Sequence, residues 1–292
     1  MISVIVTSKG EIEIIDKCIK AIIKQLDISD ELIIVSPDIQ MFELVKKYKK
    51  TFKNILCLSD KREGKPLALM LGINNAKGDY LVMTDGDTEI SNNSIKYLKE
   101  HFNNLNVGAV TGQPISINSK NNIFGLWSHS LTNTAHEIRL MRNKKNDFIE
   151  CSGYLYMIRK GLVTSINKNA LADDSAISQQ IASKGYLIKY EPKAKVLVKY
   201  PDNFKDWINQ KVRSTGGYVQ DYASKSKFKM RNFWIELFGF WKVLKYAKSI
   251  KELCWLCLLL VVRLYVWILI LLKIKIQKQS LQKLWNPIKS TK

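Results

Sequence analysis

The sequence predicts an α/β fold in which helices flank a mostly parallel sheet and membrane-associated helices follow at the C-terminal end. Three observations predict it. Short, continuous apolar runs alternate with helical stretches over the first hundred residues, as in a parallel sheet covered on both faces. A twenty-residue apolar segment near the end is long enough to cross a bilayer. A hydrophobic share of 46% with 6 Pro and 14 Gly excludes disordered and collagen-like chains.

The first hundred residues supply the predicted sheet. Runs rich in β-branched residues predict strands at 3–8, 31–36, 54–59 and 80–85, and helical patterns at 11–26, 38–50 and 66–76 separate them. Such sheets bind ligands at the carboxyl ends of their strands. The polar residues expected at that edge are Thr7, Glu11, Asp38, Lys65, Asp85 and Asp87.

The pattern is looser beyond residue 108. A strand-like run covers 108–116, a long helix 122–142, a strand 151–160, and another helix begins at Asp173. The length allows one large domain with an appendage or two small domains, and the globular, catalytic part is expected to span residues 1–224.

Positive charge is concentrated at the C-terminal end. From residue 225 onward the chain has 15 Lys and Arg against 2 acidic residues, within a net charge of +20. A nucleic-acid-binding protein would more often carry this charge on its folded domain, so no nucleic-acid partner is expected. Here the basic residues bracket apolar sequence, which favours an anionic membrane surface as the partner.

The C-terminal part divides into a basic, aromatic-rich amphipathic region at 225–252, an apolar segment at 253–272 and a basic tail at 273–292. Arg263 interrupts the apolar segment, so a single span, a hairpin, a monotopic wedge and a pair of buried soluble helices all stay open. The chain opens on a strand-like run with no signal peptide, which predicts a cell-membrane protein with its catalytic domain on the cytoplasmic side.

The sharpest motif is TDGDT at 84–88, directly after an apolar strand. Two carboxylates one residue apart, Asp85 and Asp87, can hold a hard divalent cation and leave coordination sites for phosphate oxygens. Mn²⁺ or Mg²⁺ is therefore the expected cofactor. Acidic pairs are also common in turns, so this motif alone does not establish a metal site. The neighbouring segments are needed to distinguish the two.

Those segments read GKPLAL at 64–69, NNAKGDY at 74–80, ADDSAIS at 172–178 and QKVRS at 210–214. In content and order they resemble the GK-x-x-AL, A-x-GD, ED-x-x-LS and QxxRW motifs of family-2 glycosyltransferases, which have the GT-A fold. The similarity is strongest to membrane-associated, archaeal-type members. It implies a GT-A catalytic domain, with a Rossmann-like sheet, that uses a nucleotide-diphospho-sugar donor.

The resemblance also implies roles for individual residues. Asp87 would hold the metal, with Asp85 toward the metal or the ribose, because charge develops on the departing diphosphate. Asp174 would be the base, because a sugar hydroxyl is a poor nucleophile near pH 7. The donor-binding residues implied are Thr7, Glu11, Asp38, Lys65, Asp85 and Arg213, and those implied around the acceptor are Asp173 and Gln210.

Three segments depart from the family pattern. The PTYNE segment reads TSKGE at 7–11, so Glu11 is kept and the Tyr is replaced. The VDDGS segment reads VSPD at 35–38, so the Asp expected at the nucleotide base is displaced or missing. Ser214 replaces the Trp of QxxRW, which stacks on sugar in polymerising members, and this predicts a non-processive enzyme.

Together these features predict a membrane-anchored, inverting, metal-dependent glycosyltransferase. The acceptor predicted is a hydroxyl of a lipid-linked saccharide or glycan, since an intact base at Asp174 would serve a hydroxyl. One alternative is transfer to a polyprenyl phosphate, which is already anionic and needs little deprotonation. Another is a non-catalytic membrane scaffold that keeps the fold.

Overall fold

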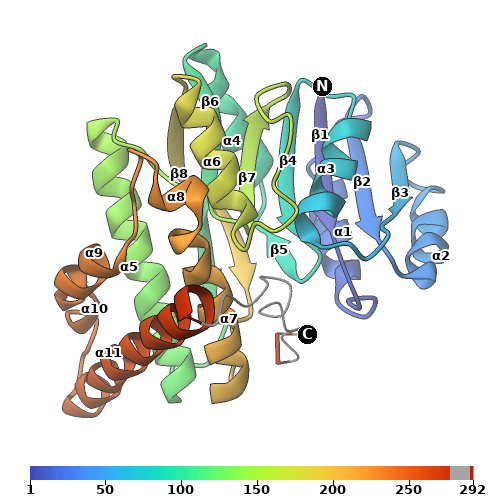
Figure 1. Cartoon of the computed structure of the whole chain (residues 1–292). Coiled ribbons are helices and arrows are strands. Elements are labelled where there is room, and N and C mark those ends of the chain that lie inside the picture. The colour runs from blue at the N-terminus through green and yellow to red at the C-terminus, as the bar shows by residue number, and fades with distance from the viewer. Residues whose placement is uncertain (277–289, 292) are drawn as a thin grey trace. The chain divides into compact units, whose positions relative to one another are not determined.

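The computed structural model describes residues 1–276 and 290–291 of the chain (Figure 1). These residues form two compact units. The first unit comprises Met1–Pro114, Ile149–Lys168 and Asp173–Val198. The second comprises Ile115–Phe148, Asn169–Ala172 and the described residues from Lys199 onward. The catalytic domain boundary at residue 224 stays a sequence-based prediction.

The first unit is built on a mixed sheet. Among the described residues, eight strands follow the order β3-β2-β1-β4-β7-β6-β8-β5. Their bounds are β1 Ile2–Thr7, β2 Glu31–Ser36, β3 Ile55–Ser59, β4 Tyr80–Asp85, β5 Thr88–Ile90, β6 Val107–Ser116, β7 Leu155–Arg159 and β8 Leu187–Val198. Strands β1 to β4 are parallel, as the sequence predicts. Strand β7 runs antiparallel to both β4 and β6, and β5 runs antiparallel to β8.

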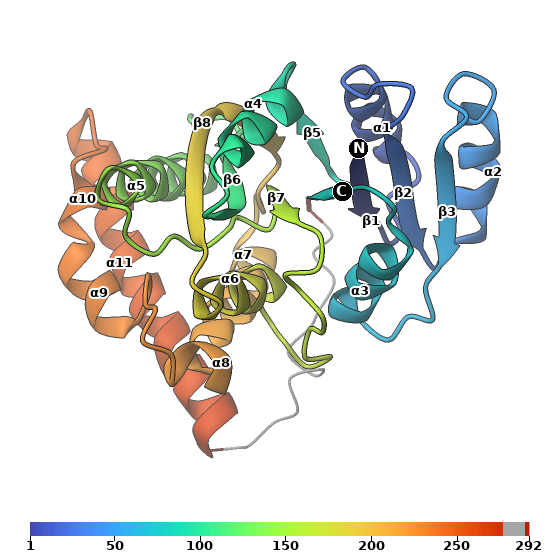
Figure 2. The same cartoon turned by 90° about the horizontal axis from the view of Figure 1, so that it is seen from above.

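Helices flank the sheet of the first unit. They are α1 Ile15–Ile23, α2 Ile39–Tyr48, α3 Lys65–Asn75, α4 Ser94–Glu100, α6 Asp173–Ser183 and the 3₁₀ turn η1 His101–Asn103. Figure 2 shows α1 and α3 on opposite sides of β1 and β2. Every residue of β1 and β2 is buried as a result. This two-sided burial explains why their sequences are continuously apolar and do not alternate.

The second unit is helical. Its elements are α5 Ile123–Lys145, α7 Phe204–Gly216, η2 Gly217–Val219, α8 Asp221–Ser224, α9 Phe233–Gly239, α10 Trp241–Leu244, α11 Ile250–Ile270 and a π-helical stretch, η3, Leu271–Ile276. A core that includes Trp127 of α5, Trp207 of α7 and Leu259 of α11 joins them. Within the amphipathic region predicted at 225–252 the structure has the two short helices α9 and α10.

One helix in the described part of the chain, over Ile250–Lys273, is long and apolar enough to cross a membrane. It begins earlier than the apolar segment predicted at 253–272, because Ser249 caps it by accepting a hydrogen bond from the Glu252 N–H. The predicted basic tail at 273–292 lies mostly outside the described residues.

Candidate functional site

The strand order reverses beside β1, which has β2 on one side and β4 on the other. At such a switch point the carboxyl ends of the strands form the usual ligand site of an α/β sheet. Thr7 and Asp85 are register partners there. The Thr7 hydroxyl donates a hydrogen bond of 3.2 Å to Asp85 Oδ1. Two of the predicted donor-binding residues therefore meet at the predicted edge.

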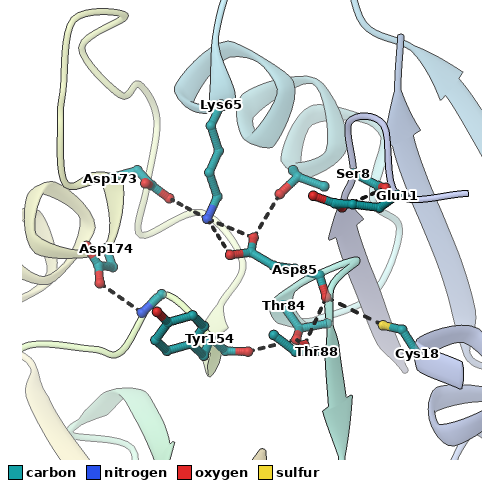
Figure 3. Close-up of polar contacts among 12 residues, drawn as sticks. Ser8, Glu11, Cys18, Lys65, Thr84, Asp85, Thr88, Tyr154, Asp173 and Asp174 are labelled. Carbon is teal, nitrogen blue, oxygen red and sulfur yellow. Dashed lines mark hydrogen bonds and ion pairs between the residues drawn. The ribbon is translucent and has the colours of Figure 1, made fainter. Parts of the chain in front are cut away.

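Lys65 joins the two acidic motifs (Figure 3). Its ammonium lies 2.7 Å from Asp85 Oδ1 and 3.9 Å from Asp173 Oδ2. All three side chains are at least three-quarters buried. Burial works against the ammonium, but the carboxylates of Asp173 and Asp85 outweigh it and raise the pKa of Lys65. Lys65 is therefore a permanent positive charge between carboxylates that come from β4 and α6.

The turn after β4 is closed by tight packing around Gly86. Its N–H donates to the Thr7 carbonyl at 3.0 Å. A Cβ at this position would lie 2.8 Å from Ser8 Oγ and 2.9 Å from Glu11 Oε2, so only glycine fits. The Ser8 hydroxyl in turn donates to Glu11 Oε2 at 2.9 Å. Glu11 is thereby fixed against the Asp85–Asp87 turn, as its predicted place at the donor edge requires.

Asp174 stands in the first turn of α6 with both carboxylate oxygens held. Oδ2 accepts a hydrogen bond of 2.8 Å from Gly153 N–H, and Oδ1 accepts one of 2.9 Å from Ser175 N–H. Burial raises the pKa of Asp174 to about 6, helped by repulsion from Asp173 and Glu150 and opposed by the charge of Lys65. A carboxyl group with a pKa near 6 is suited to proton transfer near neutral pH.

Asp38 lies at the end of β2 and precedes α2. Its Oδ2 accepts a hydrogen bond of 2.6 Å from Gly10 N–H, and its Oδ1 lies 3.7 Å from the Arg62 guanidinium. It therefore ties the loop after β1 to the loop after β2. The structure places it at the predicted strand edge, and its role toward a nucleotide stays a prediction.

Asp85 and Asp87 fit a divalent cation that takes only some of its ligands from the protein. Among the described residues, no three or more His, Cys, Asp and Glu side chains are grouped to hold a metal ion. Asp85 and Asp87 offer hard oxygen ligands at the end of a strand. Mg²⁺ and similar ions commonly take one or two carboxylates from the protein and their other ligands from phosphate and water. The pair thus fits a cation shared with a diphosphate, and not a closed structural metal site.

Gln210 and Arg213 lie on α7 in the second unit, whereas the residues above belong to the first. Their predicted contacts with acceptor and donor stay predictions. Ser8, Gly86 and Glu150 also belong to this site, and their roles were not predicted from the sequence. The first two were recognisable as small residues next to strand ends, but nothing near Glu150 signals its approach to Asp174.

Comparison with known proteins supplies a family. A family model for "Glycosyl transferase family 2" matches residues 3–166. Poly-beta-1,6-N-acetyl-D-glucosamine synthase of Staphylococcus aureus (strain COL) is 29% identical over 208 residues, which cover 67% of this chain and 50% of the synthase. The synthase of the same name from Staphylococcus epidermidis is 27% identical over 205 residues. The chain thus spans about half the length of these synthases.

Solved structures show the same fold at low sequence identity. The mannosyltransferase PcManGT from Pyrobaculum calidifontis, in complex with GDP-Man and Mn²⁺, aligns with a TM-score of 0.71 at 17% identity, over 95% of this chain and 88% of that one. Residues 1–349 of Staphylococcus aureus TarS, in complex with UDP-GlcNAc, align with a TM-score of 0.50 at 12% identity, over 84% of this chain and 80% of that one.

Proposed function

The chain belongs to glycosyl transferase family 2, and from that premise we propose that it is a membrane-anchored, metal-dependent, inverting glycosyltransferase. The donor is a nucleotide-diphospho-sugar. The acceptor is a hydroxyl of a lipid-linked saccharide or glycan on the cytoplasmic side of the membrane. One sugar is transferred in each encounter, since Ser214 replaces the Trp expected in polymerising members.

The main support for the proposal is that the two acidic motifs, residues 85–87 and 173–174, lie close together in the folded chain. Residues 85–87 and Asp173-Asp174 are far apart in the sequence, yet Lys65 contacts Asp85 and Asp173 together (Figure 3). Transfer from a nucleotide sugar needs one group that stabilises the departing diphosphate and another that takes a proton from the acceptor. The cluster offers a candidate for each task at the carboxyl edge of one sheet.

In the proposed reaction Asp174 accepts the proton of the acceptor hydroxyl. The N–H groups of Gly153 and Ser175 fix its carboxylate, so its orientation does not depend on the substrate. Asp85 and Asp87 would hold a divalent cation, which supplies positive charge to the diphosphate when bound. Lys65 adds a second, permanent positive charge beside them.

A donor-binding experiment tests the first half of the proposal. The melting temperature of the full chain is measured with UDP, GDP and their sugar conjugates, with and without Mn²⁺. Ligand at a hundred times its dissociation constant stabilises a fold by about 2.7 kcal/mol. We expect a metal-dependent shift with one nucleotide series, lost in Asp87→Ala and kept in Glu89→Ala, an exposed carboxylate two residues away. No shift with any nucleotide would favour the non-catalytic scaffold.

The acceptor chemistry is tested at Asp174. If the acceptor is a hydroxyl, Asp174→Asn should lower kcat by about 10²–10⁴-fold while nucleotide binding persists, because the proton then has no carboxylate to accept it. If the acceptor is a polyprenyl phosphate, the variant should retain substantial turnover. Parallel assays with a polyprenyl phosphate and with a lipid-linked saccharide separate the two.

A further inference from the structure

Helix α11 has two unlike faces along its 21 residues. Its buried side chains are Leu256, Leu259, Val262, Arg263, Val266, Trp267 and Ile270. The buried apolar ones, apart from Trp267, belong to one core with residues of α5 and α7. The inner face of α11 is therefore covered by protein from its second turn to its last residue.

Polar contacts join this inner face to its neighbours at two further places. Near the start of α11, Trp127 Nε1 of α5 donates to the Trp255 carbonyl at 2.7 Å. Near the middle, Arg263 Nη2 donates to Thr215 Oγ1 of α7 at 3.1 Å. The residue Ile270 at the far end is fully buried in the same core. Helices α5, α7 and α11 thus pack as one body.

That packing conflicts with a helix that crosses a bilayer. The neighbour α7 carries four charged side chains, Lys205, Asp206, Lys211 and Arg213, and the last turns of α5 carry Arg142, Lys144 and Lys145. If α11 crossed the hydrocarbon core, it would carry parts of these helices in with it. Charged side chains placed there are costly unless they are paired or reach water.

Arg263 is neutralised within the protein. It stands in the middle of α11, which is the bilayer centre if the helix crosses. Its guanidinium pairs with Glu236 of α9, donating to Oε2 at 2.7 Å, and Trp267 Nε1 donates to the same oxygen at 3.2 Å. The ion pair is satisfied inside the protein, on the side of α11 that faces α7 and α9, so no charge is left for lipid.

The outer face of α11 is apolar and exposed. It presents Ile250, Leu253, Leu258, Val261, Tyr265 and Ile268, mostly three or four residues apart, and Leu272 of η3 continues it. Trp234, Phe238 and Trp241 of α9 and α10 are exposed as well. An exposed apolar surface of this kind on a soluble protein marks an interaction site.

The excess of positive charge in this part of the chain favours an anionic membrane as the partner of the exposed face. Residues 225–273 contain ten Lys and Arg against two acids, and one of those acids is Glu236, which Arg263 neutralises. Lys245 lies 4.2 Å from the ring centre of Trp241, and Lys251 lies 4.6 Å from that of Trp255. Aromatic rings beside lysines are typical of helices in the interface of an anionic bilayer.

From these contacts we infer that α11 lies in the plane of an anionic membrane, with its outer face in the lipid, and does not cross the bilayer. This inference rests on the membrane association proposed above and specifies its geometry.

Probe depth along α11 tests the inference. A depth-sensitive fluorophore is attached to single cysteines at Ile250, Val261 and Leu272, whose side chains are 83%, 61% and 41% exposed. The background carries Cys57, Cys254 and Cys257 replaced by Ser and keeps the buried Cys18 and Cys151. The full chain is bound to phosphatidylglycerol-containing vesicles whose lipids carry bromine at defined depths.

An in-plane helix places all three probes at one depth, so the same brominated lipid should quench each of them most. A crossing helix would instead leave the Val261 probe at the bilayer centre and the other two at opposite surfaces. Probes that stay unquenched while the vesicles bind protein would show the face covered by a second copy. Either of these last two results would overturn the inference.

A pair of matched variants completes the test. Ile268→Asp places a charge on the outer face, where the side chain is 54% exposed, and should weaken vesicle binding at least tenfold, as loss of one buried Ile predicts. Ile28→Asp makes the same change at a 94% exposed site in the first unit and should leave binding unchanged. Nucleotide-induced melting shifts are measured on both variants, so a failed donor site is recognised separately from a failed membrane contact.

Discussion

Asp174 lies among groups that make its ionised form less favourable, and its pKa is raised from 3.8 to about 6 mainly by burial. If this carboxylate is the base, kcat should fall as the pH drops through about 6, because the protonated carboxyl cannot accept a proton. Since folding raises this pKa, the group also lowers the free energy of unfolding as the pH rises from 3.8 to about 6. A pH profile of kcat between pH 4.5 and 8.5, spanning the range in which such bases titrate, measures the acid limb.

The neighbouring carboxylate supplies the control for that profile. Repulsion from Asp173 is the second cause of the raised pKa, after burial. Asp173→Asn should therefore shift the acid limb of kcat to lower pH in whatever activity the variant keeps. An acid limb that stays at the wild-type pH would assign it to a group other than Asp174.

Gly86 lies between the two carboxylates of the DxD motif, and its surroundings leave no room for a side chain. Gly86→Ala would bring a Cβ to 2.8 Å from Ser8 Cβ and 2.9 Å from Glu11 Oε2. We expect a loss of about 1–3 kcal/mol in the free energy of unfolding, as overpacking typically gives. Nucleotide binding should weaken as well, because Asp85 and Asp87 flank the displaced turn.

Gly239→Ala is the matched control for that change. A Cβ at Gly239 meets no heavy atom within 4 Å, so the same substitution there should leave nucleotide binding unchanged. Urea unfolding and isothermal titration of both variants measure the two effects. Equal behaviour of the two variants would contradict the packing argument at Gly86.

At the scale of elements, the Arg263–Glu236 pair joins α11 to α9. Arg263→Met leaves Glu236 mostly buried without its partner, which should cost about 3–5 kcal/mol. Replacing both residues, as Arg263→Met with Glu236→Leu, should cost less than the single change, because no charge is then left unpaired. Urea unfolding of Arg263→Met, of Glu236→Leu and of the double variant gives the coupling energy, and strictly additive losses would show that the pair is not coupled.

The sequence predicts those elements whose burial is uniform. Strands β1, β2 and β4 are buried on both faces, so their apolar runs stand out. Strand β8 was not predicted, because its burial alternates and its sequence, LIKYEPKAKVLV, contains three Lys, a Glu and a Pro. Helices α9 and α10 share one amphipathic pattern, and the break between them directly follows Gly239, a residue that weakens a helix but does not by itself end one.

In the candidate site, too, some residues could be predicted from the sequence and others could not. Thr7, Asp85 and Lys65 were predictable because strand ends and motif order place them at one edge. The hydrogen bond from Gly153 N–H to Asp174, and the influence of Glu150 on its pKa, come from segments that meet only in the folded chain. Contacts of that kind are set by tertiary packing, which no spacing in the sequence encodes.

At the scale of the whole molecule, charge and chemistry are divided between the two compact units. The carboxylates of the candidate site and Lys65 belong to the first unit, and the basic, aromatic region with α11 belongs to the second. We therefore expect donor and lipid to act on different parts of the chain. Hydrogen exchange with mass spectrometry resolves both responses in one experiment.

Nucleotide with Mn²⁺ should slow exchange at the ends of β1 and β4 and at the starts of α3 and α6, where the site residues lie. Anionic vesicles should slow it in α9, α10 and α11. Exchange in helix α7 tests whether Gln210 and Arg213 bind substrate, because this helix carries both residues and belongs to the second unit. If these residues bind substrate as predicted, nucleotide alone should protect α7. Nucleotide protection confined to the first unit would remove Arg213 from the donor site and leave its phosphate-binding role to Lys65.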